Sequence, residues 1–149
     1  MLSFKQFLLY ESFDRPYDIS IKREGEDRVT YAATLPDNKT LSVWFEKIED
    51  DKWATGFDMD SKSDSKDAIR ILATVMEAVR AFRERKKTPK FIRIDIPKRD
   101  VFTKEDASKK LRLFRTLIDK HSRNLGYKVQ SVSDTPAYIV YELKKARKG

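Results

Sequence analysis

The sequence contains no cysteine, which excludes disulfides, thiolate nucleophiles and cysteine-based metal sites. Its one histidine, His121, cannot form a histidine-rich metal site. No apolar run approaches the ~20 residues that a membrane-spanning helix needs. The first residues also lack the charged-then-apolar pattern of a secretory signal. We therefore expect a soluble intracellular protein that has no membrane contact and no cofactor.

Glycine and proline are also scarce, with 4 and 5 residues among 149, which argues against a long linker or a low-complexity tract. The 40% apolar content predicts one domain with a single core. Lysine and arginine number 32 and aspartate and glutamate 24, so the net charge is +8. Such an excess favours binding to nucleic acid, an anionic membrane or an acidic protein. The alternative is that the charge serves solubility alone.

The most regular pattern is a helix over Ser65 to Lys87. Apolar residues recur on one arc at a period of 3.6, and charged residues fall on the opposite arc. Asp64 or Ser65 can cap the first turn, and Thr88-Pro89 ends the helix. We expect this helix to lie against a sheet.

Strands are predicted on both sides of that helix. Alternation of apolar and polar residues, or strand-forming composition, predicts strands over residues 17–23, 29–35, 41–45 and 53–59. Short polar turns join these strands into an antiparallel meander. After the helix, residues 90–97 form a fifth strand and residues 104–125 a second helix. Gly126 is placed for a left-handed helix end. Residues 129–133 and 137–143 are the last strands.

The predicted fold is therefore α+β: a single domain with two main helices and a mixed, mostly antiparallel sheet of about seven strands, in the order ββββαβαββ. The domain should span residues 13–143. Residues 1–12 form a separate N-terminal segment, and residues 144–149 form a basic tail.

This order resembles the GCN5-related acetyltransferase fold with its first helices lost or reduced. Leu125-Gly126-Tyr127 echoes the close of that fold's last helix. Uncharacterised acetyltransferase-like proteins of phages and bacteria are similar over about residues 53–143, through Thr74-Val75, residues 91–96 and Arg112-Leu113-Phe114. The resemblance implies the fold and a phage origin, and it implies no enzymatic activity.

Acetyltransferases of that fold bind the coenzyme A pyrophosphate on a glycine-rich loop at the start of the central helix. The corresponding stretch, Asp58 to Asp67, has no glycine and four aspartates, which would repel a pyrophosphate. Phe114 stands nearest to the family's proton-donating tyrosine and has no proton to give. We expect the acetyltransferase-like fold without acetyltransferase activity, and we assign no catalytic residue. The same stretch lacks the glycine and glutamate that a calcium-binding EF-hand loop needs, so a linker that caps the helix is the better interpretation.

The N-terminal segment MLSFKQFLLYES has a loose helical spacing of apolar residues, which suits an amphipathic helix docked on the sheet. It also resembles the head-targeting peptides of proteins packaged inside tailed-phage capsids. Leu9, Glu11 and Ser12 would then mark the processing site, with cleavage after Glu11. This resemblance implies a place in the virion interior, or otherwise in the host cytoplasm.

The second helix carries basic residues on its polar face, and together with the tail it could form a phosphate-binding stripe. The alternative is an ordinary solvated helix face, and nothing in the pattern suggests base readout. The candidate residues are Lys109, Arg112, Arg115, Lys120, Arg123, Lys144, Lys145, Arg147 and Lys148.

Our leading hypothesis from the sequence is a non-enzymatic phage accessory protein that binds nucleic acid or a host protein through this basic surface. One alternative is an acetyltransferase that uses acetyl-coenzyme A, and another is an inhibitor of a host defence protein. The sequence leaves the oligomeric state open.

Overall fold

The fold was examined in a computed structural model, which describes residues 16–35, 39–59, 65–85, 89–97 and 107–146. The first four strands are β1 (Ser20–Glu24), β2 (Arg28–Thr34), β3 (Thr40–Glu49) and β4 (Lys52–Met59). They are followed by helix α2 (Ser65–Arg85), strand β5 (Phe91–Pro97) and helix α4 (Ala107–Asn124). Strands β6 (Tyr127–Asp134) and β7 (Tyr138–Lys145) complete the fold. The predicted α+β class and element order are confirmed.

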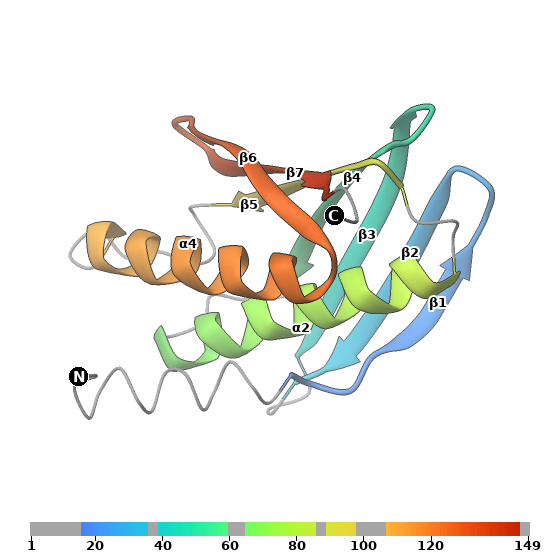
Figure 1. Ribbon diagram of the computed structural model, residues 1–149. Helices are drawn as coiled ribbons and strands as arrows, with labels where there is room; N and C mark the ends of the chain where they lie inside the picture. The colour runs from blue at the N-terminus through green and yellow to red at the C-terminus, as the bar shows by residue number, and fades with distance from the viewer. Residues whose placement is uncertain (1–15, 36–38, 60–64, 86–88, 98–106, 147–149) are drawn as a thin grey trace.

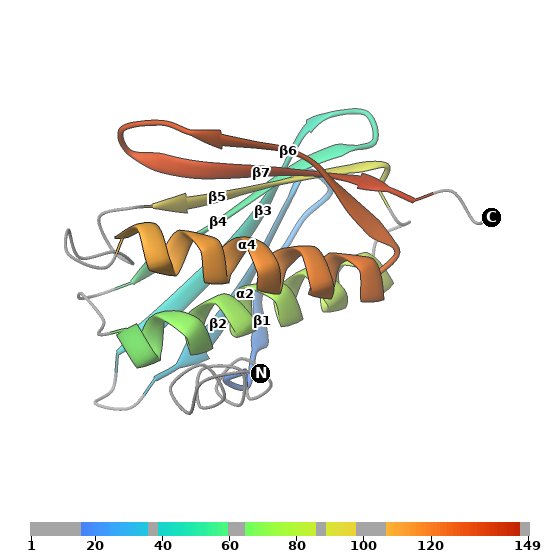
Figure 2. The same cartoon turned by 60° about the vertical axis from the view of Figure 1, so that its left-hand side comes forward.

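The seven strands form one sheet in the order β1-β2-β3-β4-β5-β7-β6. All neighbours are antiparallel except β4 and β5, which are parallel because α2 carries the chain back between them. Helices α2 and α4 lie side by side on one face of this sheet (Figures 1 and 2). No described helix covers the opposite face, which we call the open face.

The core lies between the sheet and the two helices, where the strand alternation places Leu41, Val43 and Phe45 towards α2. Phe45 stacks on Phe82 of α2, with ring centroids 4.3 Å apart and planes 7° apart. Trp53 of β4 meets Phe82 edge-on at 4.8 Å. Phe82 of α2 thus packs against two strands, and the predicted contact between this helix and the sheet is confirmed.

The first strand differs from its prediction. It begins at Ser20 instead of residue 17, and all five of its residues are exposed. Ile21, an apolar position of the predicted alternation, is 39% exposed. The register shifts between Ile21 and Arg23, and β1 is an edge strand, so the alternation is broken and the face that it predicted is not buried.

Tyr17 is nevertheless buried, because it packs on α2 ahead of the strand. Its backbone N–H donates to Thr74 Oγ1 over 2.9 Å, and the Thr74 hydroxyl donates to the Arg70 carbonyl over 2.8 Å. The Arg70 guanidinium lies 4.0 Å from the centroid of the Tyr17 ring. The chain is therefore anchored to α2 before it enters the sheet.

The end of α4 follows the predicted pattern. Gly126 has φ +85°, the left-handed conformation expected of a helix end. Tyr127, the next residue, is buried, and its hydroxyl donates to the Pro89 carbonyl over 2.5 Å. Strand β7 continues through Lys144 and Lys145, so it extends two residues past the predicted boundary of the tail.

Two buried tyrosines give the fold a pH limit. Burial raises the pKa of both Tyr127 and Tyr141 to about 12, while nearby Arg83 and Arg115, respectively, act in the opposite direction. Because the pKa in the folded state lies above the unfolded-state value of ~10, folding favours the protonated phenol. The contribution of each tyrosine to the free energy of unfolding is therefore complete below pH ~10 and is lost as the pH rises towards 12.

We therefore expect urea midpoints to fall between about pH 10 and pH 12, with each tyrosine contributing on the order of 2 kcal/mol. Tyr141→Phe should flatten this fall, whereas Tyr138→Phe, at a position that is 46% exposed, should follow the wild type. Identical pH profiles for wild type and Tyr141→Phe would contradict the assignment.

Candidate functional site

The net positive charge of the chain comes entirely from its last part. Residues 107–149 contain eleven lysines and arginines and three acidic residues, a net charge of +8. Residues 1–106 contain 21 of each kind and are neutral. The whole excess therefore belongs to α4, β6, β7 and the residues after them.

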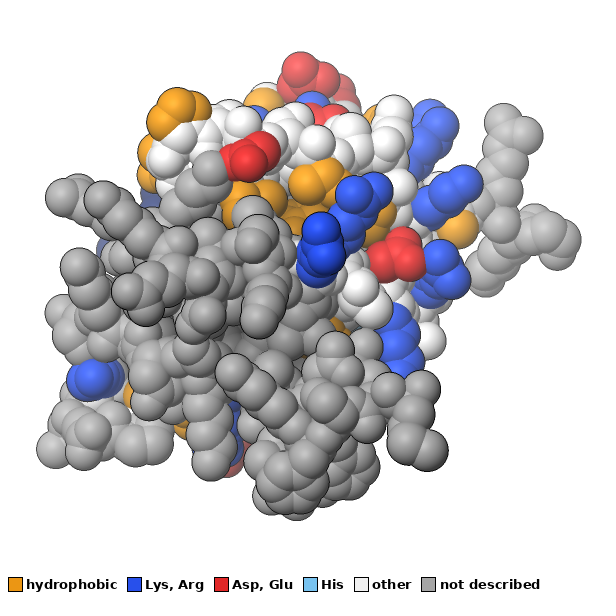
Figure 3. Space-filling view, turned by 90° about the vertical axis from the view of Figure 1, so that its left-hand side faces the viewer, with side chains coloured by type: hydrophobic (Ala, Val, Ile, Leu, Met, Phe, Trp, Pro, Cys, Tyr) orange, Lys and Arg blue, Asp and Glu red, His pale blue; other side chains and the backbone are white. Residues whose placement is uncertain are grey.

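We call the described lysine and arginine side chains of this part the basic surface. Figure 3 shows lysine and arginine side chains gathered towards its right-hand side, with few acidic groups among them. The members whose side chains the structure describes are exposed: Arg112, Arg115, Lys120 and Arg123 on α4, Lys128 on β6, and Lys144 and Lys145 on β7.

The predicted residues have different surroundings within this surface. Arg123 pairs with Asp119 at 2.7 Å, one turn earlier on α4. Within the described part of the chain, Arg112, Arg115, Lys144 and Lys145 are in no ion pair. The structure describes the backbone of Lys109 but not its side chain. Arg147 and Lys148, and the proposed processing residues Leu9, Glu11 and Ser12, lie outside the described residues.

Strand pairing brings further cations close to Lys144 and Lys145, where the paired ends of β5, β7 and β6 meet. Lys128 of β6 is the register partner of Lys144 on β7, and Lys144 is in turn the partner of Phe91 at the start of β5. The backbone N–H of Lys145 donates to the Lys90 carbonyl over 2.8 Å. Sequence reasoning missed Lys90, Phe91 and Lys128, because only the strand order β5-β7-β6 makes them neighbours.

Three arginines of the first part are paired with carboxylates. Arg80 bonds Glu77 and Glu84 on α2, Arg85 bonds Glu24 of β1 at 2.5 Å, and on the open face Arg93 makes two bonds with Asp95. Strong pairing to Glu77 and Glu84 raises the pKa of Arg80. Exposed pairs contribute little stability, but they remove free charge from the surface.

The loop that would hold coenzyme A in the resembled enzymes is mostly outside the described residues, which include Asp58 but not 60–64. Strands β4 and β5 pair in parallel only over Lys52 to Thr55 and Phe91 to Ile94, although both strands continue. Among the described side chains, no group of three or more metal-ligating residues is found, and no described helix has the length and apolarity to span a bilayer.

His121 and Trp44 are both partly buried. His121 lies in the last turn of α4. Trp44 lies on the open face across Gly56: a Cβ at residue 56 would be 2.9 Å from Trp44 Cε2. Glycine at this position leaves the space that the indole ring fills.

Comparisons with known proteins give a fold likeness only. No family model and no curated protein matches the chain. A crystal structure assigned as an acetyltransferase from Sphaerobacter thermophilus is 14% identical, with a TM-score of 0.46 over 99% of this chain and 90% of that one. RimL, the ribosomal L7/L12 alpha-N-protein acetyltransferase, is 10% identical, with a TM-score of 0.37 over 81% and 72%. Neither likeness bears on activity or ligands.

Proposed function

We propose that this protein binds nucleic acid through the basic surface and catalyses no reaction. The observation that carries the proposal is the confinement of the whole net charge of +8 to residues 107–149. A patch of one sign raises the local concentration of a polyanion far more than the same charge spread evenly. Arg112, Arg115, Lys144 and Lys145, which form no ion pair with any other described residue, are exposed and can contact phosphates.

The expected mode is contact with the phosphate backbone. Guanidinium and ammonium groups bind phosphate oxygens without reading sequence. Each neutralised phosphate releases counterions, so the affinity should fall steeply with salt. Binding of this kind would be non-specific.

The test is reversal of two charges on α4, Arg112→Glu together with Arg115→Glu. Fluorescence anisotropy with labelled DNA should show at least ~10-fold weaker binding at moderate salt. The slope of log K against log salt should become shallower by roughly 2, because about two phosphate contacts are lost.

The matched control is Lys22→Glu with Arg23→Glu, which makes the same change of charge on exposed β1 at the opposite edge of the sheet. This control should bind DNA nearly as well as the wild type. Equal weakening by the two pairs would show that only total charge matters. No binding by the wild type at low salt would refute the proposal and leave a protein partner, such as a host defence protein, to be sought by pull-down.

A virion interior, which the N-terminal resemblance implies, would suit a protein that binds packaged nucleic acid. We propose this location on the sequence of residues 1–12 alone. Mass spectrometry of purified virions would test it: the chain should start at Ser12, and an intact N-terminus in mature heads would contradict processing.

An acetyltransferase is the second candidate, favoured by the early end of the β4–β5 pairing. Beyond Thr55 and Ile94 the two strands no longer bond each other, so backbone N–H and C=O groups there could bond the amides of an extended ligand. The four aspartates between Asp58 and Asp67 argue against a pyrophosphate at the start of α2. Saturable heat on titration with acetyl-coenzyme A would favour the enzyme and overturn the non-enzymatic function.

A further inference from the structure

The aromatic ring of Phe91 lies at the corner where the basic surface meets the open face. Lys90 Nζ is 5.7 Å from the ring centroid and Lys144 Nζ is 6.0 Å from it. These distances are at the outer limit of a cation–π contact. Neither ammonium group is therefore held tightly by the ring, and both can turn towards a bound anion. Phe91 is half-buried, so part of its ring is accessible.

The backbone around this ring is firmly held. The Phe91 N–H donates to the Asp51 carbonyl over 2.9 Å, at the turn between β3 and β4. Phe91 also pairs with Lys52 on one side and Lys144 on the other, because β5 lies inside the sheet. A ring carried on such a firmly held backbone loses less freedom when a flat ligand stacks on it than a ring on a mobile loop would.

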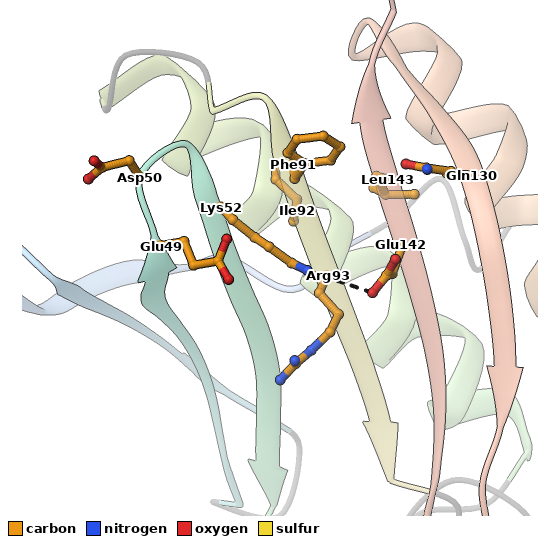
Figure 4. A pocket seen from close by; sticks show the side chains of 9 residues that line it. All are labelled: Glu49, Asp50, Lys52, Phe91, Ile92, Arg93, Gln130, Glu142 and Leu143. Atoms are coloured by element: carbon orange, nitrogen blue, oxygen red, sulfur yellow. Dashed lines mark ion pairs between the residues drawn. The ribbon is translucent and has the colours of Figure 1, made fainter.

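Two hollows lie in this region, and Phe91 lines the first of them. The first, of about 300 Å³, lies on the open face, and Figure 4 shows Lys52 reaching across β5 towards Glu142, 3.8 Å away. Its carboxylates are Glu49, Asp50 and Glu142, of which Asp50 and Glu142 each lie within ion-pair distance of a lysine.

The second hollow, of about 430 Å³, contains no acidic residue among its lining groups. Lys128, Lys144 and Lys145 supply its charge, and Gln130 lines both hollows. A phosphate would be attracted to the second hollow, and Lys144, which lines it, is the register partner of Phe91.

We infer that the basic surface selects single-stranded nucleic acid, with one base stacked on Phe91 and the neighbouring phosphate bound by Lys144 and Lys128. This inference rests on the proposed function. An unpaired base has a free face to lay on a ring, whereas the bases of a duplex are stacked on each other and shielded. Lysine contacts alone would not distinguish the two forms.

The test compares the full chain with Phe91→Leu, which keeps an apolar side chain and removes the ring. Anisotropy would be measured with a short oligothymidylate, the matching oligouridylate and a DNA duplex of equal length. Phe91→Leu should weaken single-strand binding by roughly 5- to 100-fold, the range of one lost stacked base. Duplex binding and the salt slope should not change. The two oligonucleotides show whether the strand is DNA or RNA.

Two variants keep the result interpretable. Phe91→Tyr retains a ring and should bind a single strand like the wild type. Tyr138→Leu removes an aromatic ring that is 46% exposed on the open face, opposite residue 97 and far along β5 from Phe91, and should also leave binding unchanged. Thermal melting of each variant checks that it is folded.

The outcomes separate this inference from the proposed function. Unchanged single-strand affinity in folded Phe91→Leu, or equal loss for single strand and duplex, would overturn the stacked base alone, provided that reversal at Arg112 and Arg115 still weakens binding. If the wild type binds neither form at low salt, both proposals fall.

Discussion

Phe82→Ala should lower the free energy of unfolding by about 3–5 kcal/mol. Phe82 is fully buried and touches Phe45 and Trp53, so its loss opens a cavity between α2 and two strands. Stability of the order of 5–15 kcal/mol is usual for a domain, so this one change removes a large share of it. Urea unfolding followed by tryptophan fluorescence would measure the loss, with Trp53 reporting from beside the site.

Phe82→Leu is the graded comparison. It keeps most of the apolar volume but loses the parallel stacking with Phe45, and it should cost less than about 2 kcal/mol. If Phe82→Ala costs no more than Phe82→Leu, the aromatic cluster does not hold α2 to the sheet as described.

Thr74→Val should cost about 1–3 kcal/mol, because it leaves the buried N–H of Tyr17 without its acceptor. Valine has the same branching and nearly the same size, so packing is retained. The loss should also be local: hydrogen exchange at the Tyr17 amide should quicken more than exchange in the middle of β3.

Thr116→Val is the matched control. Thr116 makes the same hydroxyl bond to the carbonyl four residues earlier, 3.0 Å from Arg112 O, but it is exposed, and no described residue distant in sequence donates a bond to it. Its replacement should change stability by less than about 0.5 kcal/mol. Thr74→Ser, which keeps the oxygen, should recover most of the Thr74→Val loss; a serine variant as unstable as valine would show that the methyl group matters instead.

The sequence predicts the elements better than it predicts the site. The 3.6-residue period places α2 and α4, and alternation places β2, β3, β5 and β7 well, because each pattern is local and one face of each element is buried. It fails at β1, where an edge strand has little to bury and a register shift after Ile21 breaks the period. The left-handed Gly126 was predictable from its position after the last helical turn.

The cluster around Phe91 could not be predicted in the same way. Lys90, Lys128 and Lys144 are separated by up to 54 positions and meet only because β7 inserts between β5 and β6. The spacing of residues along the sequence does not predict that strand order. The arginines of α4 were found because they share one helix, and the helix period alone places them on one face.

Both borders of the sheet carry an irregularity in strand pairing, between Ile21 and Arg23 in β1 and between Val129 and Ser131 in β6. Such kinks, together with exposed lysines such as Lys22 and Lys128, make a poor template for another strand. We expect that neither border recruits a second molecule by strand addition, so crowding many copies into a small volume should not drive them into fibrils.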